Sequence, residues 1–345
     1  MIISGDVAVG RIGIVLNIPS QLSKEKWLVN LEGSLVKNGS DYLSRSGVYN
    51  DLDAIKAIKN EICLYAISLA NNHVIDVENI STTQANARML NLFTVGAGKD
   101  INYSRREIEI DGFTIISFGW ECIECVQAGL FNQGVNPYNK ENVFRTVKEL
   151  LDNGKRVVCF FHWNYELEKY PQPYDRKLAH ELIDMGVEAV IGCHAHRVQP
   201  IEFYKGKPIV YGLGNFIFCQ GHYFDGKLKF PKFCEEEYAF EISSDGYKLH
   251  YFHYDQQENR LDYVKSADIR EEKEFDGKAE FTGFSYNEYN EWFKQHRVQK
   301  KLLPIFYANE STLSYWAKSE WIKIRGGLIN LLANMHLKSR NRANK

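Results

Sequence analysis

The sequence has no long apolar run and no large excess of charge of either sign. No uncharged apolar stretch reaches the ~18 residues typical of a bilayer-spanning helix, so we expect no such helix. The 345 residues carry 42 Lys and Arg against 44 Asp and Glu, a net charge of −2. General nucleic-acid binders usually have a basic excess, and we therefore predict no nucleic-acid partner.

We also expect neither a secretory leader nor a disulfide framework. Asp6 follows the strand-like residues Met1-Ile-Ile3 after only two residues. This leaves no room for the basic segment, apolar core and cleavage site of a signal peptide. The seven cysteines are odd in number, and Cys122-Ile-Glu-Cys125 is a lone C-x-x-C without a second pair. We therefore expect free thiols and a cytoplasmic protein.

What the sequence does contain is five short apolar runs that end in side chains able to bind metal. Ile2-Ile3 precedes Asp6, Trp27–Leu31 precedes Glu32, Ile62–Ile67 precedes Asn71-Asn72-His73, Arg156–Phe161 precedes His162, and Glu188–Gly192 precedes His194 and His196. Such runs are typical of buried parallel strands, and ligands bind outside the carboxyl ends of those strands. Any one His or Asn is more often a helix cap or a turn residue, but five together indicate one shared cleft.

Helices and hairpins between these runs predict an α/β core with two mixed sheets. Helical patterns occupy residues 48–60, 78–91, 140–153 and 174–185, the last opening near Asp175 and stopping at Gly186. Three turn signals, at Asp111-Gly112, Lys205–Lys207 and Ser244–Gly246, separate pairs of strand-like runs and predict hairpins.

The character of the chain changes after about residue 265. Residues 268–280 are dense in charge, which predicts a main domain over 1–265, a charged connector over 266–285 and a helical extension with a basic tail over 286–345. The extension mixes Trp316, Trp321 and other apolar side chains with Lys and Arg. Two interpretations stay open: a helix packed on its own domain, or an amphipathic basic stretch that makes a peripheral contact with the inner membrane or docks on a partner.

Seven motifs follow one another in a characteristic order. They are Gly5-Asp6, Asn30–Gly33, Ala70–His73 with Asp76, Gly96–Gly98, His162-Trp163 with Glu166, Gly192–His196 and Tyr211–Phe216. In this order the chain resembles the CapA family of bacterial capsule and poly-γ-glutamate biosynthesis proteins, within the calcineurin-like metallophosphatase superfamily. The resemblance covers about residues 1–255 and implies a four-layer α/β/β/α sandwich with a metal cleft at one edge.

The resemblance also implies a set of metal ligands. Asp6 and His196 would bind one ion, Glu32 would lie nearest the bridging position, and Asn72, His162 and His194 would bind a second ion. His73 would be left for acid chemistry, with Asp76 orienting its ring. A set of carboxylate, amide and imidazole groups without thiolate suits one or two Mn, Fe or Zn ions.

Three further residues are candidate contacts for an anionic polymer or phosphoester substrate: Asn71, Arg11 and Glu166. A lone arginine such as Arg11 is more often a surface charge. The chain also departs from the superfamily pattern, because Ala8 stands where many members have histidine. Two functions therefore remain. One is a metal-dependent hydrolase in capsule, poly-γ-glutamate or exopolysaccharide biosynthesis. The other is a non-catalytic assembly or export component of a capsule or polyglutamate synthesis machinery, which keeps the fold and whose C-terminal segment would contact a capsule synthase.

Overall fold

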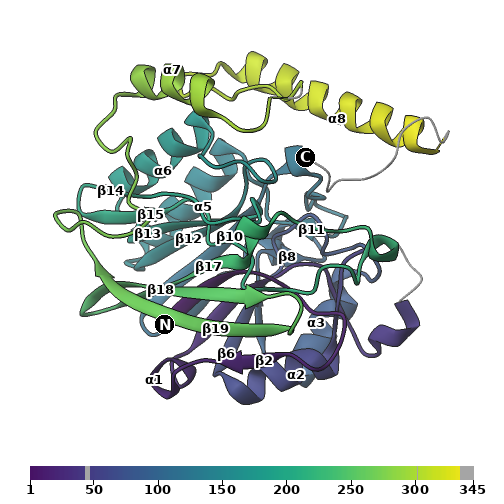
Figure 1. Ribbon diagram of the computed structural model, residues 1–345. Coiled ribbons are helices and arrows are strands. Elements are labelled where there is room, and N and C mark those ends of the chain that lie inside the picture. Colours follow the sequence, from purple (N-terminus) through teal and green to yellow (C-terminus); the bar gives the residue numbers. More distant parts are fainter. Residues whose placement is uncertain (43–46, 301, 335–345) are drawn as a thin grey trace.

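Two mixed β-sheets form the centre of the protein, shown in Figure 1 as a computed structural model that describes residues 1–42, 47–300 and 302–334. The first sheet runs in the order β2 (Val15–Asn17), β19 (Arg260–Ile269), β18 (Gly246–Asp255), β17 (Glu236–Ser243), β1 (Ile2–Ala8), β3 (Trp27–Leu31), β6 (Leu64–Ser68) and β7 (Phe93–Val95), with β16 (Ile217–Phe218) beside β1. Strands β1, β3, β6 and β7 are parallel, whereas β17 and β18 are antiparallel to their neighbours.

The second sheet has parallel strands at its centre and antiparallel strands at both ends. Its order is β14 (Ile201–Tyr204), β15 (Lys207–Val210), β13 (Ala189–Cys193), β12 (Val157–His162), β10 (Phe113–Gly119) and β9 (Ile108–Ile110). Two short pairs lie outside both sheets: β4 (Ser34–Val36) with β5 (Tyr49–Asp51), and β8 (Ala97–Gly98) with β11 (Gly134–Val135). The three predicted hairpins are β9–β10, β14–β15 and β17–β18, so the prediction of two mixed sheets is confirmed.

Side chains alternate along the strands and so build two separate apolar layers. Ile3, Leu28 and Val158 belong to a buried cluster that also contains Phe240 of β17, and this cluster fills the space between the sheets. Because successive strand residues point to opposite faces, Ile2 and other neighbours pack on the helix-covered sides. Figure 1 shows α2 and α3 on one outer side and α5 and α6 on the other, which is the predicted four-layer sandwich.

The helices begin and end where capping chemistry allows. Their bounds are α1 (Ser20–Ser23), α2 (Leu52–Glu61), α3 (Ile80–Met89), α4 (Ile101–Ser104), α5 (Lys140–Asp152), α6 (Pro173–Met185), α7 (Tyr286–His296) and α8 (Thr312–Asn334). Helix α6 ends at Gly186, whose φ of 111° favours glycine, as predicted. It begins at Pro173, before the expected start near Asp175, because the fixed φ of proline suits the first helical position.

Asp175, in the first turn of α6, is expected to make stability depend on pH. Its carboxyl group accepts a 2.5 Å hydrogen bond from the Tyr138 hydroxyl, and burial raises its pKa to about 7. The folded state therefore holds this proton more tightly than the unfolded state, so the contribution is complete below pH ~4 and is lost as the pH rises through ~7. Urea unfolding of Asp175→Asn should show a flatter decline over that window than the wild type; parallel curves would contradict the prediction.

The C-terminal segment packs against the α5–α6 side of the second sheet (Figure 1). The buried Arg176 side chain donates to Glu202 at 2.6 and 2.9 Å and to the Phe284 carbonyl at 3.0 Å. Glu168 accepts hydrogen bonds from the backbone N–H groups of Val298 and Gln299. Where this segment divides from the main domain stays a prediction.

Strand β19 extends to Ile269, past the boundary expected near residue 265. The predicted basic tail, residues 338–345, lies outside the described residues. Within the described ranges, none of the helices is both long and apolar enough to cross a membrane.

Candidate functional site

The polar residues that follow the apolar runs meet at the carboxyl ends of the central strands of both sheets. Asp6 lies within β1, Glu32 follows β3, and His162 ends β12. His162 is the register partner of Cys193 at the end of β13, which places His194 beside it. The two sheets therefore bring residues from distant parts of the chain to one edge, as the parallel-strand rule predicts.

Asp6 forms the centre of this cluster. It is fully buried, and its Oδ1 accepts a 2.7 Å hydrogen bond from the Asn30 amide while its Oδ2 accepts one of 3.2 Å from the backbone N–H of His194. His196 Nδ1 lies 3.4 Å from the same Oδ2. Burial raises the pKa of Asp6, and the neighbouring His196 opposes that shift. The carboxylate is thus oriented on both sides before any ligand arrives.

Glu32 lies next to Asp6 and is the most informative residue of the cluster. Its side chain is fully buried, and neither carboxylate oxygen has a hydrogen-bond partner among the described residues. His73 Nε2 and His196 Nε2 each lie 3.7 Å from Oε1. Burial, with the Asp6 carboxylate beside it, raises the pKa of Glu32 well above its usual range. A carboxylate in such a place is costly unless a cation compensates it.

Two groups of side chains are close enough to share a cation. The potential ligand atoms of Asp6, Glu32 and His196 all lie within 4.8 Å of one another, and so do those of Asp6, His162 and Cys193. All five residues are buried. Carboxylate and imidazole groups gathered in this way fit a divalent ion, and the unpartnered oxygens of Glu32 supply an independent reason to expect one.

His162, His194 and Asn72 form the second half of the cluster. His162 Nε2 lies 3.1 Å from His194 Nδ1 and 2.8 Å from Asn72 Oδ1, so three ligand-type atoms converge. Burial lowers the pKa of His162 well below its usual range, and the nearby His196 and His73 add to the effect. The ring is therefore neutral, which is the form that binds metal.

The backbone that carries two of these histidines is held in a rarely populated conformation. The φ angles of His194 and His196 are 89° and 51°, in the left-handed region that favours glycine. Such angles persist only where the surrounding structure imposes them, and they gather at functional sites. Here they let both side chains of a single tight turn face the cluster.

His73 approaches Glu32 from the turn after β6. Its Nδ1 lies 2.7 Å from Asp76 Oδ2, and that oxygen also accepts a 2.8 Å hydrogen bond from the backbone N–H of Val48. With Nδ1 engaged in this way, the opposite ring nitrogen points toward Glu32. Asp76 thus stands where it would orient the ring.

Comparison with known proteins matches residues 22–220 to the family described as "Bacterial capsule synthesis protein PGA_cap". The chain belongs to this family. The matched region holds the predicted ligands from Glu32 to His196, whereas Asp6 precedes it. The family is metallophosphatase-like, so the sequence resemblance and the fold agree.

Several curated relatives share part of the chain. The PGA biosynthesis protein CapA of Bacillus subtilis is 31% identical over 176 residues, covering 49% of this chain and 46% of the relative. The capsule biosynthesis protein CapA of Bacillus anthracis is 28% identical, covering 49% and 43%. A "probable polyglutamine synthesis accessory protein" of Mycobacterium tuberculosis is 26% identical, covering 59% and 58%. The chain therefore spans about half the length of the curated relatives that it matches.

The three predicted substrate contacts of this PGA_cap protein lie in different settings. Asn71 is buried, and its amide donates to the Leu31 carbonyl at 2.8 Å and accepts from the backbone N–H of His73 at 3.2 Å, an arrangement that favours a positioning role. Glu166 is partly exposed, and its charge contributes to the raised pKa of Glu32. Arg11 is exposed on the segment after β1. Their contacts with substrate stay predictions.

The structure adds three residues that the sequence interpretation left without a role. Asn30 orients Asp6, and Asn215 Oδ1 lies 2.7 Å from His196 Nδ1, which turns the other ring nitrogen toward Glu32. Cys193, which belongs to the thiols expected to be free, has its Sγ 3.1 Å from His162 Nδ1, and burial raises the pKa of its thiol well above the usual range. The polar Asn30 within the apolar run Trp27–Leu31 was the sequence feature that could have indicated the role of this residue beside Asp6.

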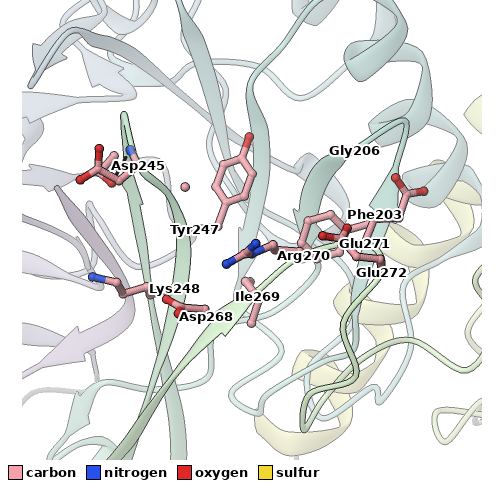
Figure 2. Close-up of a pocket in the computed structure, with 12 residues that line it drawn as sticks. Phe203, Gly206, Asp245, Tyr247, Lys248, Asp268, Ile269, Arg270, Glu271 and Glu272 are labelled. Atoms are coloured by element: carbon pink, nitrogen blue, oxygen red, sulfur yellow. Dashed lines mark hydrogen bonds between the residues drawn. The ribbon is translucent and has the colours of Figure 1, made fainter.

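A cavity of about 530 Å³ lies elsewhere on the protein (Figure 2). It is lined by the turn of the β17–β18 hairpin and the end of β19, with Lys248, Arg270 and Asp268 among its side chains. Ile2, at the start of β1, is the register partner of Glu241, so this hairpin turn lies at the opposite end of β1 from Asp6. The cavity is therefore separate from the histidine cluster.

Proposed function

We propose that this PGA_cap protein is a cytoplasmic, metal-dependent hydrolase of the metallophosphatase type that acts in capsule, poly-γ-glutamate or exopolysaccharide biosynthesis. Its substrate would be a phosphoester or a polymer-linked group. The observation that supports this most is the Glu32 carboxylate, buried without a hydrogen-bond partner between His73 and His196. A purely structural core rarely keeps such a group.

The donor set suggests how metal would be held. Asp6, Glu32 and His196 would bind one ion, and the group His162, His194 and Asn72 a second; Mn, Fe and Zn all suit these donors. Divalent ions in such a site lower the pKa of water and neutralise charge on phosphoryl oxygens. The protein itself keeps His162 neutral and holds Asp6 in place through Asn30.

His73 is the group that we assign to proton donation. Asp76 fixes Nδ1, so Nε2 is the atom that would give its proton to the leaving oxygen of the substrate. Asp76 is a positioning residue, because its carboxylate contacts the ring and the backbone of Val48.

The His73→Gln variant tests this assignment. With Mn²⁺ present, we expect its kcat for an unsubstituted phenyl phosphodiester, whose basic phenolate leaves poorly without a proton, to fall about 100-fold with little change in KM, because removal of a general acid costs about that much. For a 2,4-dinitrophenyl leaving group, which needs no proton to depart, the loss should be less than about tenfold. Steady-state kinetics on both substrates measure the difference.

His253→Gln, on β18, is the matched control and should leave both rates unchanged. Equal losses on the two leaving groups would contradict the role of His73 as an acid. The proposed hydrolase activity would be contradicted if wild type hydrolysed neither substrate faster than Asp6→Ala does, whichever of Mn, Fe or Zn is added.

A non-catalytic role in polymer assembly or export is the second candidate, and one specific residue favours it. Ala8, at the position where many metallophosphatases have histidine, is fully buried in an apolar cluster with Val36 and Phe218. The name of the mycobacterial relative, a probable accessory protein of polyglutamine synthesis, also fits such a role. The protein would then bind a polyanionic polymer or a synthase through the same edge.

A further inference from the structure

The last helix of the described chain, α8, presents two different faces. One face packs on the 3₁₀ helix η2 (Glu121–Ile123): the indole N–H of Trp120 donates to the Tyr315 hydroxyl at 2.8 Å, and Cys122 Sγ donates to Ser319 Oγ at 3.3 Å. Lys323 adds an ion pair with Glu121 at 3.3 Å. These contacts fix the rotation of the helix about its axis.

The other face exposes a stripe of large apolar side chains. Six such residues of α8 are between 43% and 73% exposed: Leu313, Trp316, Trp321, Ile324, Leu328 and Leu331. At 100° per residue, all of them except Trp316 fall within an arc of about 80°. Soluble proteins rarely leave a continuous apolar surface of this kind uncovered, and such surfaces mark contacts with partners or membranes.

The charge of the surrounding sequence indicates what covers the stripe. Residues 321–345 contain six Lys and Arg and no Asp or Glu, while residues 1–320 carry a net charge of −8. Two copies of this segment packed symmetrically would bring like charges together, which disfavours a second copy of the chain. Anionic lipid headgroups would instead attract the cationic segment while the apolar side chains enter the lipid.

We propose that α8 lies flat on an anionic membrane surface, with the Leu313–Leu331 stripe among the lipid chains and the net positive charge of residues 321–345 attracting the anionic headgroups. The helix is attached to the same sheet edge as the histidine cluster, because Trp120, which binds Tyr315, also donates its backbone N–H to the His162 carbonyl at 3.1 Å. Membrane binding would therefore hold that edge close to the bilayer. This membrane contact would form whether or not the protein is a hydrolase.

Vesicle flotation of the full chain tests the proposal. Wild type should bind vesicles of phosphatidylglycerol and phosphatidylcholine at least about tenfold more tightly than vesicles of phosphatidylcholine alone, and high salt should weaken the binding. Trp321→Glu combined with Ile324→Glu should lose at least about tenfold. Met89→Glu combined with Val264→Glu is the matched control, since these apolar residues are 58% and 57% exposed on other elements, and it should bind like the wild type.

A second variant tests the proposal without any substitution in the described part of α8, in case the first variant disturbs the folding of that helix. Replacing Lys338, Arg340 and Arg342 by Gln leaves the described helix intact and should also weaken binding to the anionic vesicles by about tenfold. Equal binding of wild type to both kinds of vesicle, or no binding to either, would overturn the proposal. So would a wild-type dimer in sedimentation that the Trp321→Glu/Ile324→Glu variant converts to a monomer, because the stripe would then be an interface between copies.

Discussion

An Asp6→Ala variant is expected to bind Mn²⁺ or Zn²⁺ at least about 100-fold more weakly than the wild type, since loss of a second-shell partner alone typically costs 10- to 100-fold. Asp6 belongs to the group with Glu32 and His196 and to the group with His162 and Cys193, so its removal takes a carboxylate away from both. Isothermal titration calorimetry on metal-stripped protein, with the metal content of the purified protein as a second readout, measures the loss.

Two companion variants make this result specific. Asp152→Ala, at the exposed end of α5, removes a carboxylate far from the cluster and should leave metal affinity unchanged. Glu32→Gln should weaken metal binding while leaving the metal-free protein at least as stable as the wild type near neutral pH, because it removes a buried acid that has no partner. Unchanged affinity in both Asp6→Ala and Glu32→Gln would show that the cluster is structural.

The Arg176→Ala variant is expected to lower the free energy of unfolding by about 3–5 kcal/mol. The change leaves the Glu202 carboxylate buried with only His180, at 3.2 Å, and Tyr211, at 2.7 Å, beside it. It also removes the hydrogen bond to the Phe284 carbonyl, which ties the C-terminal segment to α6. Urea unfolding measures the change in the free energy of unfolding. Limited proteolysis should cleave the chain beyond residue 281 sooner in the variant than in the wild type.

A double variant separates the charge from the packing. Arg176→Met combined with Glu202→Leu removes both partners and should cost much less than Arg176→Ala alone, because no buried charge is left without a partner. If the single and double variants lose equal stability, the ion pair is not what holds the C-terminal segment.

Much of the fold was predictable because local patterns decide it. Apolar runs with polar ends identified β1, β3, β6, β12 and β13, and the turn at Ser244–Gly246 identified the β17–β18 hairpin. The sequence alone could not show that this hairpin joins the first sheet beside β1. That pairing joins Ile2 to Glu241, and no local pattern reports contacts between such distant residues.

The candidate site divides in the same way. The types and positions of the candidate ligands follow from strand ends, whereas the residues that orient them depend on tertiary contacts. Asn215 faces His196 only after the β15 segment has packed beside β13, and Cys193 touches His162 only through strand pairing. The absence of a hydrogen-bond partner for Glu32 is a property of the packed interior, so no sequence motif expresses it.

The Trp120 side chain has a practical consequence for shortening the protein. Its ring packs on those of Tyr165 and Phe306, and its indole N–H depends on Tyr315. A truncation before Thr312 would expose these aromatic rings and leave the indole N–H of Trp120 without its hydrogen-bond partner. Trp120 directly follows β10, in which Gly119 is the register partner of His162. A shortened protein for crystallisation should therefore end no earlier than Gly327, so that it keeps Tyr315, Ser319 and Lys323, which contact Trp120, Cys122 and Glu121.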